Sequence, residues 1–195
     1  MTVARELAVD ELVTRRLRLR PPRRSDTGPL HAGIVETLPE LIKWLPWARE
    51  GHTRADTRRY IRGARMALAR RGAYEFIIEE IETGDPIGVT SLHRIDWIRR
   101  SAGVGYWIRR SRWDKGLATE GVGALIDQGF RVYHLHRLEA HVALENHASQ
   151  RVVEKLGFER EGVAREVEFV NGRHLDHIQY SLLRPKSLRH SGRLP

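Results

Sequence analysis

A strand, a short basic loop and the start of a helix follow one another between residues 104 and 133, and this succession constrains the fold most strongly. The run Val104-Gly-Tyr-Trp-Ile108 is rich in β-branched and aromatic residues, which favours a strand. Apolar residues then recur at helical spacing from Ala118 to Tyr133. Gly116 lets the backbone approach a ligand closely, and the first amides of a helix lack partners within it. The segment therefore predicts an α/β protein in which a helix N-terminus can receive a phosphate.

The charge of the chain is compatible with several kinds of partner. A formal net charge of +9 comes from 34 Lys and Arg residues against 25 Asp and Glu residues. Nucleic acid, an acidic protein or a polyphosphate cofactor would each suit this balance. Basic residues do gather near Gly116, at Arg109, Arg110, Arg112 and Lys115. Because arginines are also spread along nearly every other segment, the sequence favours a solvated basic surface over a nucleic-acid interface.

Length and composition indicate one domain in a cytoplasmic protein. We expect the 195 residues to form one domain over 1–184, with 1–13 as a lead-in and 185–195 as a basic, disordered tail. The absence of cysteine excludes disulfides and thiolate metal sites and suits a reducing cytoplasm. The ten histidines show no metal-ligand spacing, so no metal site is expected. No apolar run is long enough to span a bilayer, so no membrane partner is expected either.

Alternating and helical patterns divide the chain into strands and helices. Strands are predicted at 16–20, 74–81, 87–95, 102–108, 137–143, 158–170 and 173–183. Besides the helix after Gly116, helices are predicted behind the cap Ser25-Asp26, from Pro39, behind the Thr53–Asp56 capping box, and at 146–156 before Gly157. Asn171-Gly172 is a strong hairpin signal, and a two-residue turn there places Leu175 opposite Glu168.

Several short motifs lie in a fixed order along this framework. They are Trp44-Leu-Pro-Trp47, Leu92-His-Arg-Ile-Asp-Trp97, Gly105-Tyr-Trp-Ile108, Lys115-Gly-Leu-Ala-Thr119, Asn146-His-Ala-Ser149, Glu154-Lys-Leu-Gly-Phe158, and Asn171-Gly172 followed by Asp176 and Tyr180. Together they resemble the GNAT superfamily of acyl-CoA-dependent N-acyltransferases, and more narrowly its branch of ribosomal-protein serine and alanine N-terminal acetyltransferases. The resemblance implies an α/β (α+β) fold with a mixed, mostly antiparallel sheet of about seven strands, splayed between the fourth and fifth and flanked by helices.

The same resemblance implies acetyl-CoA, or another acyl-CoA, as the cofactor. Its pantetheine arm would lie in the gap between the splayed strands and pair with the backbone of Trp107, Ile108 and Arg109. Asn146 would hydrogen-bond this arm from the end of the second strand. The pyrophosphate would sit on the amides of Lys115, Gly116, Leu117, Ala118 and Thr119.

The phosphate loop departs from the family's pattern, which reads Gln or Arg, any two residues, Gly, any residue, then Gly or Ala. Trp113 stands in the Gln/Arg place, and Asp114 stands where glycine is common. A carboxylate beside a pyrophosphate should repel it. Alternatively, Asp114 caps the helix with its side chain turned aside, and nearby Arg and Lys residues compensate its charge.

Two residues match the family's catalytic groups. Ser149 matches the acid that protonates the departing thiolate, but serine in a first helical turn is equally an ordinary capping residue. Glu168 matches the glutamate proposed as general base in the N-terminal serine acetyltransferases, acting through water. Periodicity alone would make it a solvated carboxylate that shares one strand face with Glu166.

Trp44 and Trp47 are either core anchors or, as the resemblance favours, the wall of a substrate cleft. The implied reaction is direct transfer of an acetyl group to a primary amine in a ternary complex, preferably to a protein N-terminal α-amine. The alternatives are a small amine such as an aminoglycoside, polyamine or amino acid, another donor such as succinyl-CoA, and a non-catalytic nucleic-acid-binding or regulatory module. A homodimer is also expected, because the family often forms one.

Overall fold

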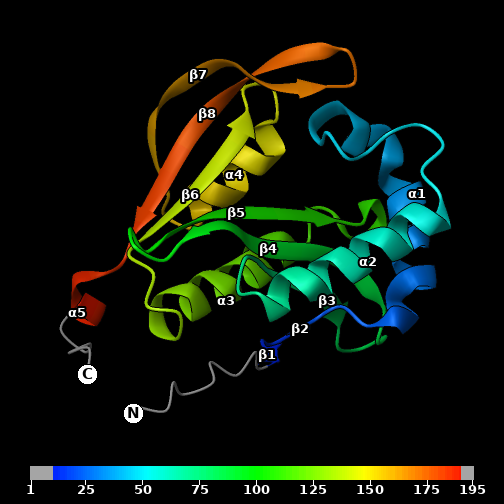
Figure 1. Ribbon diagram of the computed structural model, residues 1–195, viewed down its shortest axis with the longest axis horizontal. Helices are drawn as coiled ribbons and strands as arrows, with labels where there is room; N and C mark the ends of the chain where they lie inside the picture. Colours follow the sequence, from blue (N-terminus) through cyan, green and yellow to red (C-terminus); the bar gives the residue numbers. More distant parts are fainter. Residues whose placement is uncertain (1–10, 190–195) are drawn as a thin grey trace.

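The computed structural model describes residues 11–189, whose strands form one eight-stranded sheet in the order β1-β2-β3-β4-β5-β6-β8-β7 (Figure 1). Neighbouring strands are antiparallel except β5 and β6, which are parallel. The strands are β1 (Leu12–Val13), β2 (Leu17–Arg20), β3 (Tyr74–Glu80), β4 (Pro86–Asp96), β5 (Ser101–Ile108), β6 (Arg137–Ala143), β7 (Glu159–Val170) and β8 (Arg173–Leu183). The mixed, mostly antiparallel sheet is thus confirmed, with β1 as a strand that the sequence patterns did not indicate.

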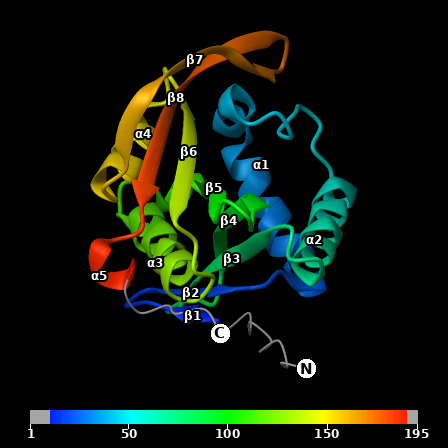
Figure 2. The same ribbon diagram turned by 60° about the vertical axis from the view of Figure 1, so that its left-hand side comes forward.

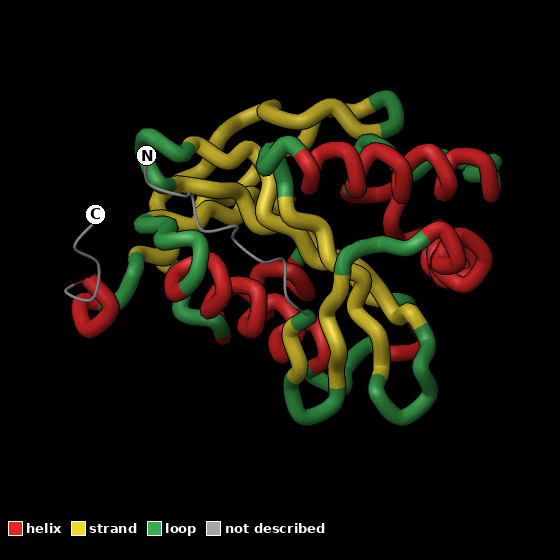
Figure 3. The backbone as a smooth tube through the Cα atoms, turned by 60° about the horizontal axis from the view of Figure 1, so that its bottom comes forward, coloured by secondary structure: helices red, strands yellow, loops and turns green. Residues whose placement is uncertain are grey.

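Helices cover both faces of this sheet (Figures 2 and 3). One face carries α1 (Thr27–Trp44) and α2 (Arg54–Ala69), and the other carries α3 (Leu117–Arg131) and α4 (His147–Lys155). A large cluster of buried apolar side chains joins the strands to α3 and α4, and a smaller one joins β3 and β4 to α1 and α2. Since burying one large apolar side chain contributes about 1.5–3 kcal/mol, these clusters fix both helical layers on the sheet.

The parallel pair β5–β6 is short, and its two strands then separate. The paired residues of β5 are Ser101, Ala102 and Gly103, although the strand continues to Ile108. Beyond that point β6 pairs only with β8 along the sheet. The expected splay is therefore confirmed, and it lies between the fifth and sixth strands here because β1 adds one to the count.

The first helical region differs from the prediction, because α1 is a single helix with Pro39 inside it rather than two short helices. A proline in a helix interior removes one backbone hydrogen bond and costs about 3 kcal/mol. Leu30, Ile34 and Leu41 nevertheless share one buried face on either side of Pro39. The packing of that face against the sheet maintains the helix through the proline.

The two ends of the described chain carry short elements where a lead-in and a tail were expected. β1 pairs with β2, and α5 (Lys186–Arg189) follows β8. This helix covers part of the segment expected as a disordered tail, while residues 1–10 and 190–195 lie outside the described part of the chain. Among the helices of residues 11–189, none is both long and apolar enough to cross a membrane.

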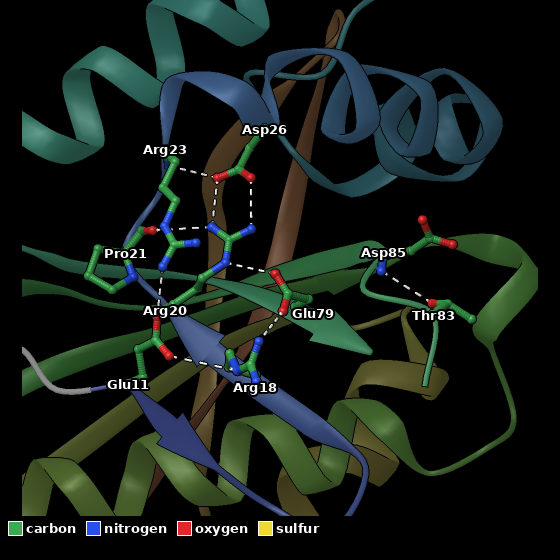
Figure 4. A network of polar contacts seen from close by, with 9 residues as sticks. All are labelled: Glu11, Arg18, Arg20, Pro21, Arg23, Asp26, Glu79, Thr83 and Asp85. Atoms are coloured by element: carbon green, nitrogen blue, oxygen red, sulfur yellow. Dashed lines mark hydrogen bonds and ion pairs between the residues drawn. The ribbon is translucent and has the colours of Figure 1, made fainter. Parts of the chain in front are cut away.

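A buried ion network fixes the start of α1 against the sheet (Figure 4). Arg20, at the end of β2, donates to both carboxylate oxygens of Asp26 at 2.9 and 2.8 Å and to Glu79 of β3 at 2.8 Å. Asp26 belongs to the short 3₁₀ helix η1 (Arg24–Asp26) that leads into α1. The hydrogen bond to Asp26 raises the pKa of Arg20 above its ordinary value, although burial opposes this shift. Because all three side chains are buried, loss of one would leave an uncompensated charge, which costs about 3–5 kcal/mol.

Candidate active site

The loop between β5 and α3 presents unpaired backbone amides. Gly116 is the N-cap of α3 and adopts a left-handed conformation, with φ of +72°. It has no side chain with which to cap the first turn, so the amides of Leu117, Ala118 and Thr119 have no partner within the helix. The positive end of the helix dipole lies at the same place. This part of the loop therefore fits the pyrophosphate of an acyl-CoA.

Asp114 does not cap this helix, because Gly116 occupies the N-cap position. Its own backbone is left-handed, with φ of +58°, and its side chain is exposed. Aspartate is one of the few non-glycine residues that tolerate this conformation. Glycine would adopt this backbone without steric cost, and the capping alternative is wrong.

Two of the four basic residues of the loop are bound to neighbouring carboxylates. Arg109 donates to Glu36 of α1 at 2.5 Å, and Arg112 donates to Glu80 at 2.9 Å. Burial favours the protonated form of Glu36, but hydrogen bonds from Arg109 and Ser111 outweigh it and lower the pKa of this carboxyl. Within residues 11–189, Arg110 and Lys115 are exposed and form no ion pair, so these two loop cations are left to meet a phosphate.

The backbone of β5 offers hydrogen-bonding groups to the gap at alternate residues. The amide of Arg109 donates to Ile87 of β4 at 2.7 Å, so the polar groups of Trp107 face β4 as well. The backbone N–H and C=O groups of Ile108 and Tyr106 consequently face the gap. The indole of Trp113 donates to the Ile108 carbonyl at 2.7 Å and satisfies it. Of the predicted stretch Trp107 to Arg109, only Ile108 is thus directed toward the gap, and Tyr106 joins it.

Asn146 and Ser149 begin α4 at the edge of the same gap. Asn146 is the N-cap, and its side-chain oxygen accepts a hydrogen bond from the Ser149 amide at 3.1 Å. The Ser149 hydroxyl lies 2.7 Å from the hydroxyl of Tyr106. Burial raises the pKa of Tyr106 to about 12, so both hydroxyls keep their protons at neutral pH. The capping alternative for Ser149 is wrong, and its side chain belongs to a hydroxyl pair that bridges β5 and α4.

Glu168 lies opposite Leu175 in the β7–β8 hairpin, as the two-residue turn predicts. The prediction that it shares a strand face with Glu166 is wrong. β7 bulges between Ala164 and Glu168, and Glu166 takes a left-handed φ of +51° while its amide donates to the Asp176 carboxylate at 2.8 Å. Glu168 itself is half-buried and lies close enough to raise the pKa of His177, although burial of that ring lowers the pKa more.

The two predicted cleft tryptophans occupy different surroundings. Trp44 packs against a small buried cluster of Ala143, Val170 and Leu175. Trp47 is 43% exposed, lies 6.5 Å from Trp107 between ring centres, and lines a cavity. The structure thus places Trp47 in a cleft wall and Trp44 in a core contact.

This cavity has a volume of about 590 Å³ and lies between the α1–α2 layer and the strands β3, β4 and β5. Besides Trp47 and Trp107, it is lined by Tyr60, Glu75, His93 and Tyr106, which the sequence analysis did not select. One signal for this floor was available: glycines alternate at 103 and 105 in β5. A Cβ at Gly103 would lie 2.6 Å from Nε2 of His93, so the imidazole rests on bare backbone.

The cavity and the gap meet at β5. Gly105, Tyr106 and Trp107 line the cavity, and Tyr106 carries the hydrogen bond to Ser149. A ligand in the gap and a second ligand in the cavity would therefore meet at Tyr106. Within the described chain, no group of histidine, aspartate and glutamate side chains could hold a metal ion.

Known proteins are similar to this chain in sequence and in fold. Residues 16–159 match the model of an acetyltransferase (GNAT) domain. YdaF of Bacillus subtilis (strain 168), named as a ribosomal N-acetyltransferase, is 35% identical over 178 residues, covering 90% of this chain and 93% of that protein. The ribosomal-protein-serine acetyltransferase of Escherichia coli (strain K12) is 28% identical over 169 residues, covering 87% of this chain and 93% of its own length.

Solved structures agree. Mycobacterium smegmatis RimJ in complex with CoA-disulfide superposes with a TM-score of 0.83 at 26% identity, covering 91% of this chain and 88% of that one. RimL, a ribosomal L7/L12 α-N-protein acetyltransferase in complex with coenzyme A, superposes with a TM-score of 0.84 at 24% identity, covering 89% of this chain and 98% of that one. This likeness bears on the fold alone. The chain belongs to the GNAT family of acetyltransferases and is an acetyl-CoA-dependent N-acetyltransferase.

Proposed function

We propose that this enzyme acetylates the N-terminal α-amine of a protein, of the kind that its ribosomal relatives modify. The observation that carries the proposal is the meeting of cavity and gap at Tyr106, beside Ser149. A cavity of about 590 Å³ with tryptophans in its wall can admit the first residues of a chain. The names of YdaF and of the serine acetyltransferase support a protein acceptor.

The donor side is assigned to backbone groups and one cation. The polar groups of Tyr106 and the amide of Ile108 would pair with the pantetheine arm as an added strand does, and the amides of residues 115–119 with Lys115 would hold the pyrophosphate. Asn146 contributes its side-chain NH₂, since its oxygen caps α4. Acetyl-CoA supplies the activated acetyl thioester when bound.

Proton movements are assigned to two side chains. Glu168 takes a proton from the acceptor ammonium through a water molecule, because it does not line the cavity directly. As the new C–N bond forms and the C–S bond breaks, the Ser149 hydroxyl gives a proton to the departing thiolate and recovers one from the acceptor nitrogen, while the Tyr106 hydroxyl holds it in place. General acid or base catalysis of this kind contributes about 10²–10⁴-fold to rate.

The test is a thiol-release assay with acetyl-CoA and a panel of peptides with free or blocked N-termini. Free α-amines should be acetylated, and the same peptides with a blocked N-terminus and a free lysine should not react. A relative named spermidine N(1)-acetyltransferase, from Vibrio cholerae, is 33% identical over 116 residues, so spermidine belongs in the panel. Turnover of spermidine with none of any peptide would overturn the proposal.

A further inference from the structure

We infer that Glu75, held by Tyr60, forms a second cation-binding subsite in the cavity, so that the preferred acceptor carries a positive charge besides the reacting amine. The inference rests on the proposed function, because it takes the cavity as the acceptor site. Glu75 comes from β3 and Tyr60 from α2, and both line the cavity. The Tyr60 hydroxyl donates a hydrogen bond to one carboxylate oxygen of Glu75.

The position of Glu75 sets the distance between the two charges. Glu75 lies opposite Ser91 of β4, which in turn lies opposite Gly105 of β5. Two strand spacings therefore separate Glu75 from β5, which is about 10 Å along the floor of the cavity. A group bound at Glu75 is thus separated from the reacting amine by the length of two or three extended residues, or of one long side chain.

Among the described residues, no cation of the protein neutralises Glu75. The other carboxylate in the cavity, Asp56, is engaged by Arg49 at 3.2 Å and Arg59 at 2.8 Å, whose side chains are mostly exposed. Burial lowers the pKa of His93, so this neighbouring ring is largely neutral near pH 7. An ion pair is formed at Asp56 but not at Glu75.

A carboxylate in this position is costly unless something pairs with it. Burial raises the pKa of Glu75, which means that the surroundings penalise its charged form, and the bond from Tyr60 offsets only part of that penalty. An ammonium or guanidinium entering the cavity would restore the charged form and gain a charge-assisted hydrogen bond. The cavity therefore favours acceptors with a second cation at this depth.

Two sources share this chemistry. One is a lysine or arginine side chain at the second or third residue of a protein N-terminus, and the other is the second amine of a polyamine. We expect the peptide to be preferred, because the wall of Trp47 and Trp107 also offers contact to apolar chain atoms.

The experiment compares two peptides that differ only in lysine or norleucine at the second residue, with spermidine as a third acceptor. For the wild type, the lysine peptide should have the lower KM. Glu75→Gln keeps an acceptor for the Tyr60 hydroxyl but removes the charge, so KM for the lysine peptide should rise at least about tenfold while that for the norleucine peptide stays unchanged. The control is Glu82→Gln, in the exposed turn after β3, which should change neither.

Other outcomes overturn the subsite. Equal KM changes for both peptides would make Glu75 a structural tie between α2 and β3, and a fall in kcat for both would make it part of the chemistry. Calorimetry with the same peptides in the presence of CoA measures their affinity for the subsite without turnover. If binding there shows no lysine preference, the inference fails, whereas a lysine preference without acetylation would count against the proposed function alone. Tyr60→Phe provides a second variant, which should weaken lysine-peptide binding less than Glu75→Gln does.

Discussion

The proposed donor site and the proposed acceptor site of this enzyme differ in whether backbone groups or side chains form them. Around the β5–α3 loop, the groups that would hold the donor are mainly backbone amides and carbonyls, and two of the loop's arginines, Arg109 and Arg112, are bound to Glu36 and Glu80 of other elements. The cavity proposed for the acceptor is lined by side chains from α1, α2, the segment between them and three strands. A site made from backbone tolerates sequence change such as Trp113 and Asp114, while a site made from side chains changes its specificity with each substitution.

The largest effect should come from Glu168→Gln, which removes the proposed base and leaves the donor side intact. We expect kcat to fall about 100-fold or more, most severely at low pH where the acceptor amine is protonated. CoA affinity, measured by calorimetry, should match the wild type. An unchanged pH–rate profile would remove Glu168 from the mechanism.

Gly116→Val tests the donor side by straining its backbone. At φ of +72° a β-branched residue is unfavourable by about 1–3 kcal/mol, so the loop should shift and CoA should bind about tenfold more weakly. Gly84→Val is the matched control, because Gly84 has the same φ of +72° in open space. It should lower the melting temperature similarly without affecting CoA. Equal affinities in the two variants would contradict a backbone-built donor site.

Ser149→Ala separates the chemistry of the hydroxyl pair from the stability of α4. Because Asn146 is the cap, the serine variant should lose kcat, though less than Glu168→Gln does, with little change in melting temperature. Asn146→Ala should instead lose about 1 kcal/mol of stability through the missing cap. A stability loss in the serine variant as large as that in the asparagine variant would show that the hydroxyl serves the fold.

Asp114→Gly should have a smaller, favourable effect. Glycine adopts the left-handed backbone without steric cost, and removal of the carboxylate reduces repulsion of the pyrophosphate. We expect CoA affinity to rise a few-fold at low ionic strength and the gain to shrink in high salt. A gain that is independent of salt would mean that backbone conformation, not charge, is responsible.

The smallest effect concerns stability of the acceptor side. Burial raises the pKa of Glu75 in the folded protein. Its contribution to the free energy of unfolding is therefore fully present below the ordinary pKa of 4.5 and is lost as the pH rises through the raised pKa. The glutamine in Glu75→Gln does not titrate. The melting temperature of this variant should therefore increase relative to that of the wild type as the pH is raised from 4 to 8, which melting curves across this range can measure. A difference independent of pH would mean that Glu75 is not penalised by burial.

Local patterns predicted most of the fold, and through-space contacts account for what they missed. The Asn171-Gly172 turn fixes the hairpin register locally, so Leu175 was correctly placed opposite Glu168. The bulge at Glu166 depends on the Asp176 carboxylate from the next strand, which no periodicity reveals. Pro39 lies inside a helix because packing against the sheet outweighs its local preference.

The site was predicted unevenly for the same reason. The phosphate-loop residues are contiguous in sequence and came from one motif, and the loop lies at the start of α3 as expected. Glu75 and Tyr60 come together only because three strands lie in register under α2, so nothing in their own segments marked them. The roles of Glu168, Ser149 and the donor-binding residues remain predictions that the variants above can test.

The open edge of β5 has a consequence for the lifetime of the protein. Backbone groups of Tyr106 and Ile108 face a gap in the middle of the sheet, and a ligand that pairs with them joins the two halves of the molecule. Binding to the folded state adds about 2.7 kcal/mol at a free ligand concentration 100 times the Kd. A cell rich in the acyl donor would thus protect this enzyme from unfolding and proteolysis, and depletion of the donor would shorten its half-life. The abundance of the enzyme would then follow the supply of the acyl groups that it transfers.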